Sequence, residues 1–557
     1  MEDRLFAQQE SSAIHSIHQS SLLHRLRLIA FAVLLAVLGL LAPLSASANQ
    51  METALKNRVE TIGDNPAVSG VSLAAPDFIQ SFYARRNHQP AWLGKPAAEQ
   101  LFAKIWASED HGFRLEDFHA SAFAGLLGAA RGGDRNAAAE FEIVATDAAI
   151  RLLHHLYFGK VNPERLDPDW NFERPMITDD PVALLSDYLA NDGYGALAEA
   201  AAPKHPQYVD LQGALKQYRE IAAAGGWPAV PSEKVLKPGE EDDRVPVLIE
   251  RLAVEGYLPE SSVETKVYDS AIEDAVKRFQ TRNGLEADGV IGAKTFAALN
   301  ATAEDRVNQI RLSMERARWI VRGLGDEFVL VNIAGAETYF SRGGKTIWRT
   351  RSITGQAYRK TPVFRDEISY MEFNPTWTVP VSIFRKDKLP RIRKDPGYLA
   401  RGGYTVRDRD GRTISPSAVN WGARNPGVTL VQKPGPKNAL GTVKFMFPNK
   451  YAVYLHDTDN RSLFDRAERN LSSGCVRLED PYGFADLLMR SVPDWSHERR
   501  DAILASGKTT RIDLPRPVPV LLTYFTAWVD DGEVMFRRDI YDRDASLLKA
   551  LDVRFRR

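Results

Sequence analysis

The pattern of apolar positions divides the chain into a helical first half and a strand-rich second half. Between residues 49 and about 230, apolar side chains recur at helical spacing, for example in 141–157 and 208–223. From residue 328 onward, short runs of β-branched and aromatic residues stand between glycine and proline breaks, which is typical of a sandwich or barrel. We therefore predict a multidomain α+β protein whose helical scaffold spans residues 49–235.

A compact unit of three short helices is predicted at residues 245–300. Its apolar positions keep helical spacing, and glycines at 284, 289 and 292 mark the turns between its helices. The charged stretch 234–244 is predicted to be a linker between this unit and the scaffold. Further helical residues at 305–325 lead from the unit into the strand-rich region.

The strand-rich region is predicted to form a mainly-β domain at residues 326–515. A polar, basic stretch at 382–437 interrupts its strands. An insertion of this length inside a β domain is more often a functional lid than a plain loop. The alternative is a solvated excursion that its arginines and lysines keep soluble. Residues 516–557 predict a strand pair and a short C-terminal helix.

The first 48 residues predict export of the chain. An apolar run at 28–44 follows a basic flank and precedes Ala46-Ser47-Ala48, which indicates a signal peptide cleaved after Ala48. The alternative is an uncleaved anchor, since a run of about 17 residues is at the lower limit for spanning a bilayer. Basic and acidic residues are equal at 72 each, so net charge does not predict a nucleic-acid partner.

Cys475 is the only cysteine in the 557 residues. It can form neither an internal disulfide nor a multi-cysteine metal site, so it is either an inert buried thiol or a reactive one. The neighbours of Cys475 favour reactivity, because Gly474 lets backbone N–H groups approach a substrate and only Val476 beside it is apolar. We predict no metal and no cofactor.

His456 is the candidate base for this thiol. Residues 451–456 alternate as in a strand, so Tyr454 and His456 should share a face opposite Val453 and Leu455. We expect His456 at the strand end, on the accessible side. A lone histidine is more often a structural hydrogen-bonder, but this one precedes the single cysteine by nineteen residues (475 minus 456).

The chemistry of the pair follows from the pKa of a free thiol, which is about 8.5 and leaves it protonated at neutral pH. The imidazole of His456 would accept the thiol proton and return it to a leaving amine. Asp480 and Pro481 predict a helix start too distant for its dipole to act on Cys475. Backbone N–H groups of Gly474 and Cys475 are the predicted oxyanion hole.

Two sets of motifs resemble known families. Residues 275–295 are similar to the peptidoglycan-binding type 1 domain. His456-Asp457-Thr458 followed by Ser472-Ser473-Gly474-Cys475-Val476-Arg477 resembles the signature of the L,D-transpeptidases, the YkuD-domain family. Further segments are similar to the large periplasmic branch of that family, which combines a helical scaffold, a peptidoglycan-binding domain and a catalytic domain with a lid: 82–92, 374–380, 434–441 and 444–449.

The resemblance implies acyl transfer on peptidoglycan. Cys475 would attack the L,D-peptide bond after the third residue of a tetrapeptide donor and release the terminal D-alanine. The thioester would then pass to a diaminopimelate side-chain amine and form a 3→3 cross-link. His456 would be the acid and base, oriented by a backbone carbonyl near Asp457, and a carbapenem would add covalently to Cys475.

The resemblance also implies substrate contacts and partners. Tyr454 and Trp377 would line the donor pocket, and Ser473 and Arg477 would hold the loop or a stem carboxylate, although each of the four could equally serve packing. The implied partners are peptidoglycan stem peptides and glycan strands in the periplasm, with other wall-synthesis enzymes as further candidates. The membrane would be contacted only through an uncleaved N-terminal segment.

Several functions stay open on these grounds. L,D-carboxypeptidase activity or attachment of a lipoprotein to the wall would use the same acyl-enzyme and differ only in the acceptor. A wall-binding scaffold with a vestigial site is a third alternative, against which the intact pair of Cys475 and His456 argues. A papain-like protease fits poorly, because the order of histidine and cysteine is reversed and the surroundings are rich in β structure.

Overall fold

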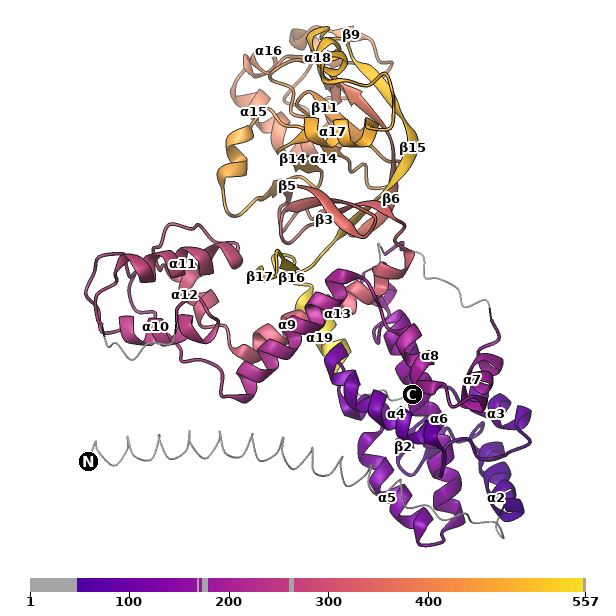
Figure 1. The fold of residues 1–557 in the computed structure, drawn as a ribbon. Coiled ribbons are helices and arrows are strands. Elements are labelled where there is room, and N and C mark those ends of the chain that lie inside the picture. The colour runs from indigo at the N-terminus through magenta and orange to yellow at the C-terminus, as the bar shows by residue number, and fades with distance from the viewer. Residues whose placement is uncertain (1–47, 168–169, 173–178, 260–264, 554–557) are drawn as a thin grey trace.

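The computed structural model describes residues 48–167, 170–172, 179–259 and 265–553 (Figure 1). The predicted export segment lies outside the described residues, apart from Ala48 at its end. Within the described ranges, no helix is both long enough and apolar enough to cross a membrane.

The N-terminal helices pack around a core of their own. The buried carboxylate of Glu142 accepts backbone N–H groups of Ala91, Trp92 and Leu93, with shortest N···O distances of 2.6 to 3.0 Å, and so ties the 91–93 loop to the central helix α6. The elements of this unit are α2 Ala48–Thr61, β1 Ala67–Val68, β2 Val71–Ser72, α3 Pro76–Arg85, α4 Pro96–Ala107, α5 Ala120–Arg131, α6 Arg135–Phe158, α7 Pro181–Ala190 and α8 Tyr194–Ala201.

Two long helices connect the scaffold to the β domain. Helix α9 (Pro206–Ala223) packs against α13 (Ala303–Ile320), and both contribute to the apolar core of the β domain. Leu215 and Ile310 from these helices belong to the same buried cluster as Val329 of the sheet. The sheet therefore rests on a rigid helical base, and α9 packs with the β domain although its sequence falls within the predicted scaffold.

The three-helix unit contains α10 (Val245–Val254), α11 (Ser270–Arg282) and α12 (Ala293–Leu299), which confirms the predicted helices. The stretch 234–244, expected to be a linker, instead packs onto this unit. Leu236 is fully buried and exchanges backbone hydrogen bonds with Ile291, because a single apolar residue among charges can still reach the core of the unit.

A nine-stranded mixed sheet forms the β domain, in the order β13-β5-β14-β12-β11-β6-β15-β3-β4. Strand β4 also pairs with β5, which closes the sheet on itself. Two helices, α17 (Pro481–Met489) and α18 (His497–Ala505), follow β14. The strands are β3 Glu327–Asn332, β4 Glu337–Arg342, β5 Lys345–Gly355, β6 Phe364–Phe373, β11 Val443–Met446, β12 Leu455–His456, β13 Asn470–Ser472, β14 Val476–Leu478 and β15 Thr510–Thr523.

The insertion is a folded layer and not a solvated excursion. Its strands make a separate sheet in the order β7-β10-β8-β9, and its apolar side chains form a distinct buried cluster that includes Phe384, Leu389 and Leu430. This layer begins at β7, before the predicted limit at 382. Its elements are β7 Trp377–Thr378, α14 Val381–Ile383, α15 Leu389–Lys394, α16 Tyr398–Arg401, β8 Tyr404–Arg407, β9 Thr413–Ile414 and β10 Thr429–Gln432.

The C-terminal residues form the predicted strand pair and helix: β16 (Ala527–Asp530), β17 (Glu533–Phe536) and α19 (Asp544–Asp552). The predicted limit at residue 515 falls inside β15. Helix α19 returns to the scaffold, where the Asp552 carboxylate lies 2.7 Å from the Arg114 guanidinium.

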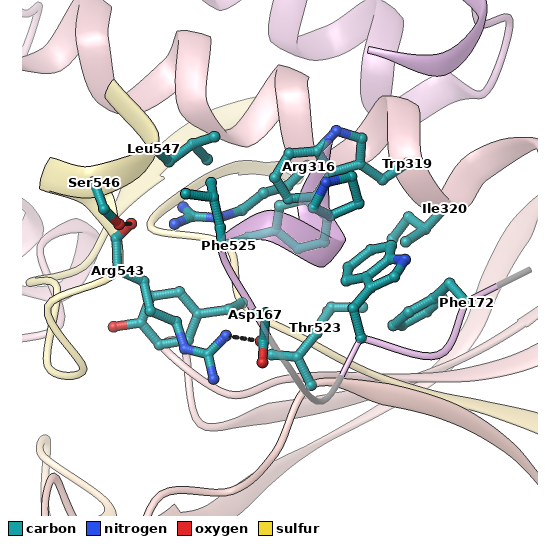
Figure 2. Close-up of a pocket in the computed structure, with 15 residues that line it drawn as sticks. Asp167, Phe172, Arg316, Trp319, Ile320, Thr523, Phe525, Arg543, Ser546 and Leu547 are labelled. Atoms are coloured by element: carbon teal, nitrogen blue, oxygen red, sulfur yellow. Dashed lines mark hydrogen bonds and ion pairs between the residues drawn. The ribbon is translucent and has the colours of Figure 1, made fainter. Parts of the chain in front are cut away.

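A small cavity marks the junction of the C-terminal segment, α13 and residues 163–172 (Figure 2). Its wall includes Arg316 and the ion pair between Arg543 and Asp167. The volume is about 60 Å³. Since one water needs roughly 10–15 Å³ by this measure, the cavity has room for a few waters and not for a peptide.

Phe484 of α17 provides a test of the packing in the β domain. It is fully buried, and its ring packs against Phe340, Trp348 and Phe445. Replacing Phe484 by Ala should lower the free energy of unfolding of this domain by about 3–5 kcal/mol, because a large cavity is left in a well-packed core. Calorimetry of the domain's transition measures the loss. Ile347→Ala, at a side chain that is 41% exposed on β5, is the control and should cost about 0.5 kcal/mol. Equal effects of the two substitutions would contradict this packing.

Candidate active site

The candidate site is built on a short parallel pairing between β12 and β14. His456 lies opposite Arg477, and Leu455 lies opposite Val476. The Val476 N–H donates to the Tyr454 carbonyl at 3.1 Å, which extends the register toward Cys475. Because side chains alternate along a strand, Tyr454, His456, Cys475 and Arg477 fall on one face of this pair.

These four side chains line one cavity of about 520 Å³, together with Trp377 and Ser473. The structure therefore brings the predicted catalytic and substrate-binding side chains into a single space. Val453 and Leu455 are buried in the core on the opposite face, as expected from the alternation.

His456 is buried rather than on the accessible side, with only 4% of its surface exposed. Leu440 and the insertion line the same cavity and cover the strand end, which the sequence pattern could not indicate. The ring Nδ1 lies 2.5 Å from the Asp457 carbonyl oxygen. Since a carbonyl only accepts, Nδ1 carries the proton and Nε2 is the nitrogen that can take one.

Burial, followed by the positive charge of Arg477, lowers the pKa of His456 to about 3, against the opposing contacts with the Asp457 and Leu440 carbonyls. The imidazole is therefore neutral at neutral pH. The Asp457 carboxylate accepts hydrogen bonds from the backbone N–H and hydroxyl of Thr442 at 2.9 Å and pairs with Arg461 at 3.0 Å. These contacts fix the backbone that orients the His456 ring.

The Cys475 thiol is protonated in this arrangement. Its Sγ lies 3.8 Å from the Ala452 carbonyl oxygen. Burial raises the pKa of Cys475, and contacts with the Tyr454 backbone N–H, the Arg477 charge and the Tyr454 hydroxyl oppose that rise. Pairing with His456 was predicted to dominate thiolate formation, whereas Tyr454 and Arg477 also favour the thiolate in the structure.

The loop before Cys475 is held by hydrogen bonds of Ser472. The Gly474 N–H donates to Ser472 Oγ at 3.0 Å, and Ser472 Oγ donates to the Cys475 carbonyl at 2.6 Å. Gly474 has φ +123°, a conformation that favours glycine. One of the two predicted oxyanion donors, the Gly474 N–H, is thus engaged within the loop.

A second brace reaches this loop from the C-terminal segment. The Thr361 hydroxyl donates to the Gly474 carbonyl at 2.8 Å and accepts the Gly355 N–H at 2.9 Å. The Tyr541 hydroxyl accepts the Thr361 N–H at 3.0 Å and donates to the Gly355 carbonyl at 2.7 Å. Residues far apart in the chain therefore fix the backbone next to the thiol.

Tyr454 and Trp377 lie at the side of the cavity next to the thiol. The Tyr454 ring is 5.6 Å from the His456 ring. Burial raises the pKa of the Tyr454 hydroxyl most strongly. A negative charge on Cys475 in its thiolate form is the second cause that raises this pKa. Trp377 begins β7, so the insertion contributes directly to the wall around the thiol.

The cavity carries an excess of positive charge. Four basic side chains line it against one carboxylate, that of Asp387: Arg359, Lys388, Arg391 and Arg477. The Nε atom of Arg477 is buried and has no hydrogen-bond partner among the described residues. A buried guanidinium donor left unpaired is costly, so Arg477 is suited to an anionic group that enters the cavity.

Ser473 links the thiol loop to the insertion. Its hydroxyl accepts a hydrogen bond from Arg359 Nη1 at 2.9 Å, and Arg359 pairs with Asp387 at 2.5 Å. Asp387 lies in a short turn of the insertion, Phe384–Lys388. Sequence reasoning missed Arg359, Asp387, Thr361 and Tyr541, because none stands in a recognisable motif. Lys388 was noted only as part of a basic stretch.

The described residues hold no group of three or more His, Cys, Asp or Glu side chains that could bind a metal ion.

Comparisons with known proteins match three parts of the chain. Residues 77–215 match a scaffold domain, residues 241–299 a putative peptidoglycan binding domain, and residues 326–510 an L,D-transpeptidase catalytic domain. A protein of Haemophilus influenzae described as a putative L,D-transpeptidase is 36% identical over 220 residues. The match covers 39% of this chain and 45% of that relative, so the chain spans less than half of the relative's length.

Two solved structures are also similar in part. An L,D-transpeptidase from Xylanimonas cellulosilytica has 15% identity and a TM-score of 0.18, covering 52% of this chain and 98% of its own. An L,D-transpeptidase from Stackebrandtia nassauensis has 14% identity and a TM-score of 0.20, covering 53% and 97%.

Alkylation by iodoacetamide should report the ionisation of Cys475 alone, since the chain has no other cysteine. Because burial raises the pKa of this thiol, the alkylation rate should rise about tenfold per unit from pH 7 to pH 9. Tyr454→Phe removes a group that favours the thiolate and should slow alkylation at each pH. His456→Gln is the control and should leave the dependence of the alkylation rate on pH unchanged. A rate that is already at its plateau below pH 7 would instead indicate a preformed thiolate and imidazolium.

Proposed function

Because residues 326–510 belong to the L,D-transpeptidase family and accompany a scaffold and a peptidoglycan-binding domain, we propose that the chain is an L,D-transpeptidase of the cell wall. The observation that carries the proposal is the cavity in which Cys475, His456 and Arg477 lie together. The proposed donor is a tetrapeptide stem, and the proposed product is a 3→3 cross-link.

Acylation begins from a neutral thiol and a neutral imidazole. The Nε2 atom of His456 takes the thiol proton as Cys475 Sγ bonds to the carbonyl carbon of the third stem residue. The bond from that carbon to the nitrogen of the terminal D-alanine breaks, and His456 returns the proton to this leaving amine. The low pKa of His456 suits this second role, because an imidazolium in that environment releases its proton readily.

Charge on the tetrahedral oxygen requires donors near Gly474 and Cys475. The Gly474 N–H is held by Ser472 Oγ, so this donor becomes available only when the hydroxyl turns away. We therefore propose the Cys475 N–H as the first oxyanion donor and Gly474 as the second. The brace from Thr361 keeps both peptide units in place.

Arg477 is the proposed anchor for a stem carboxylate. Its unpaired Nε and the positive excess of the cavity lining favour an anion at this point, in competition with the nearby Asp459 carboxylate. Tyr454 and Trp377 then form the wall against which the donor lies, and Ser473 holds the loop through Arg359.

The insertion has the proposed role of protecting the thioester. Transfer to an amine competes with hydrolysis, so water has to be held away from the acylated thiol. The insertion supplies Trp377, Ile383 and Lys388 to the cavity wall and is tied to the thiol loop through Arg359 and Asp387. The acceptor is the side-chain amine of a diaminopimelate on a neighbouring stem.

We also propose that the protein lies in the periplasm, that residues 1–48 are either cleaved or serve as an anchor, and that a carbapenem acylates Cys475. Use of water or a lipoprotein amine as acceptor is the second candidate, favoured by the fact that the thiol chemistry is the same in each case. A non-catalytic scaffold would retain wall binding without any turnover.

Product analysis tests the reaction. The full chain, in detergent, is incubated with purified disaccharide-tetrapeptides, and the products are identified by mass spectrometry. We expect dimers that lack one D-alanine, and none from Cys475→Ala, which removes the nucleophile. Shortened monomers alone would assign hydrolysis, and activity of Cys475→Ala near that of the wild type would overturn the role of the thiol. Absence of turnover with retained binding to sacculi would assign a scaffold.

Arg477→Gln tests the carboxylate anchor. Loss of a charged hydrogen bond to the donor of about 1.4 kcal/mol should raise KM for the tetrapeptide about tenfold. Arg385→Gln is the matched control, since Arg385 is an exposed arginine of the insertion that does not line the cavity. Initial rates over a range of donor concentrations give KM for the tetrapeptide in each of the two variants. An unchanged KM in Arg477→Gln would contradict the anchor.

A further inference from the structure

Two adjoining hollows separate the three-helix domain from the catalytic domain. Their volumes are about 670 Å³ and 490 Å³. Both are lined by Leu285 and Lys294 of the three-helix domain and by Glu468 and Asn470 of the catalytic domain. Since they share these walls, they form one groove, which we call the interdomain groove.

The interdomain groove adjoins the catalytic cavity. Leu471 lines both the larger hollow and the cavity that contains Cys475. Ala357 lines the larger hollow, while its chain neighbours Gln356 and Tyr358 line the catalytic cavity. The larger hollow and the thiol cavity therefore lie side by side at these residues.

The walls of the groove are fixed by contacts at its base. Arg282 of α11 pairs with Glu533 of β17, and Arg537 Nη1 donates to the Arg282 carbonyl at 2.9 Å. Arg306 of α13 donates to the side-chain oxygen of Asn283 at 2.7 Å. These contacts hold the three-helix domain to the C-terminal strand pair and to α13 beside the hollows, so the position of this wall does not depend on a bound ligand.

The lining of the groove is polar and carries both signs of charge, which suits an extended polar chain. The larger hollow is lined by three basic side chains, Lys294, Arg466 and Arg538, and by three acidic ones, Glu286, Asp288 and Glu468. Lys294 lies 2.7 Å from Glu468 across the groove, and Arg538 lies 3.6 Å from the same carboxylate. The Lys294 and Glu468 side chains are largely exposed, so their ion pair is worth at most about 1 kcal/mol and a bound anion can replace Glu468.

We propose that the interdomain groove binds a glycan strand of the wall, a chain of neutral amino sugars with carboxylate-bearing peptides. A stem peptide that leaves this strand near Leu471 enters the catalytic cavity and presents its carbonyl to Cys475. This inference rests on the proposed function. It assigns the three-helix domain a part in orienting the donor, in addition to attachment to the wall.

A tryptophan in the groove tests this inference. Ala293 is exposed at the start of α12 and lines both hollows, so Ala293→Trp should block the strand without disturbing a core. Ala271→Trp, at an exposed position of α11 that lines neither hollow, is the matched control. The full chain, in detergent, is assayed with long glycan strands that carry tetrapeptides and with the disaccharide-tetrapeptide.

We expect Ala293→Trp to lower kcat/KM at least tenfold for the long strands and less than twofold for the disaccharide. The control should match the wild type on both substrates. Equal losses of kcat/KM on both substrates, or no loss on the long strands, would overturn the proposal that the groove binds the glycan strand. If Ala293→Trp has a lower melting temperature than the control, the double variant Arg466→Ala with Arg538→Ala replaces it and is judged by the same criteria.

Failure of the proposed function would be seen separately, as absence of turnover by the wild type on either substrate. The groove is then tested by binding of solubilised long strands to the full chain. At least tenfold weaker binding by Ala293→Trp than by Ala271→Trp would support the inference. Equal binding by the two variants would overturn it.

Discussion

The parallel pairing of β12 with β14 is the constraint on which the site depends. It sets His456 opposite Arg477 and, through the hydrogen bond from Val476 to Tyr454, places Cys475 beside Tyr454. A parallel pair needs a long connection between its strands, and residues 457–475 supply it. The rest of the β domain supports this pair: β11 flanks β12, and β5 flanks β14.

The resting site keeps both reactive groups neutral. Burial lowers the pKa of His456 and raises that of Cys475, so neither a thiolate nor an imidazolium is stored before the substrate arrives. Arg477 and the Tyr454 contacts favour the thiolate. A stem carboxylate that offsets the Arg477 charge would weaken this support for the thiolate and would raise the pKa of His456, which makes the imidazole a stronger base. On the proposed function, proton transfer from Cys475 to His456 would accompany attack on the donor carbonyl.

Much of this arrangement could be predicted from local sequence. Helical spacing located α10, α11 and α12, and strand alternation placed Tyr454 and His456 on one face, because both signals depend on neighbouring residues. The accessible position expected for His456 was wrong, since Leu440 and the insertion cover it and their position depends on tertiary packing. Local sequence also gave no sign that 234–244 would pack on the three-helix domain.

The braces of the thiol loop show the same limit. Tyr541 contacts Gly355 across 186 residues, and Arg359 reaches Asp387 in the insertion, yet neither tyrosine nor arginine stands in a motif. Such contacts depend on how separate segments meet. They could be located only once the sheet, the insertion and the C-terminal segment were placed together.

The central claim is that Cys475 becomes acylated by the stem of a donor inside this cavity. Intact-protein mass spectrometry of the full chain, after brief exposure to tetrapeptide donor without any acceptor amine, tests it most directly. We predict a mass increase equal to the mass of the donor minus the mass of one D-alanine, located on Cys475 by peptide mapping. An unmodified Cys475 under conditions where the donor is nevertheless consumed would contradict it.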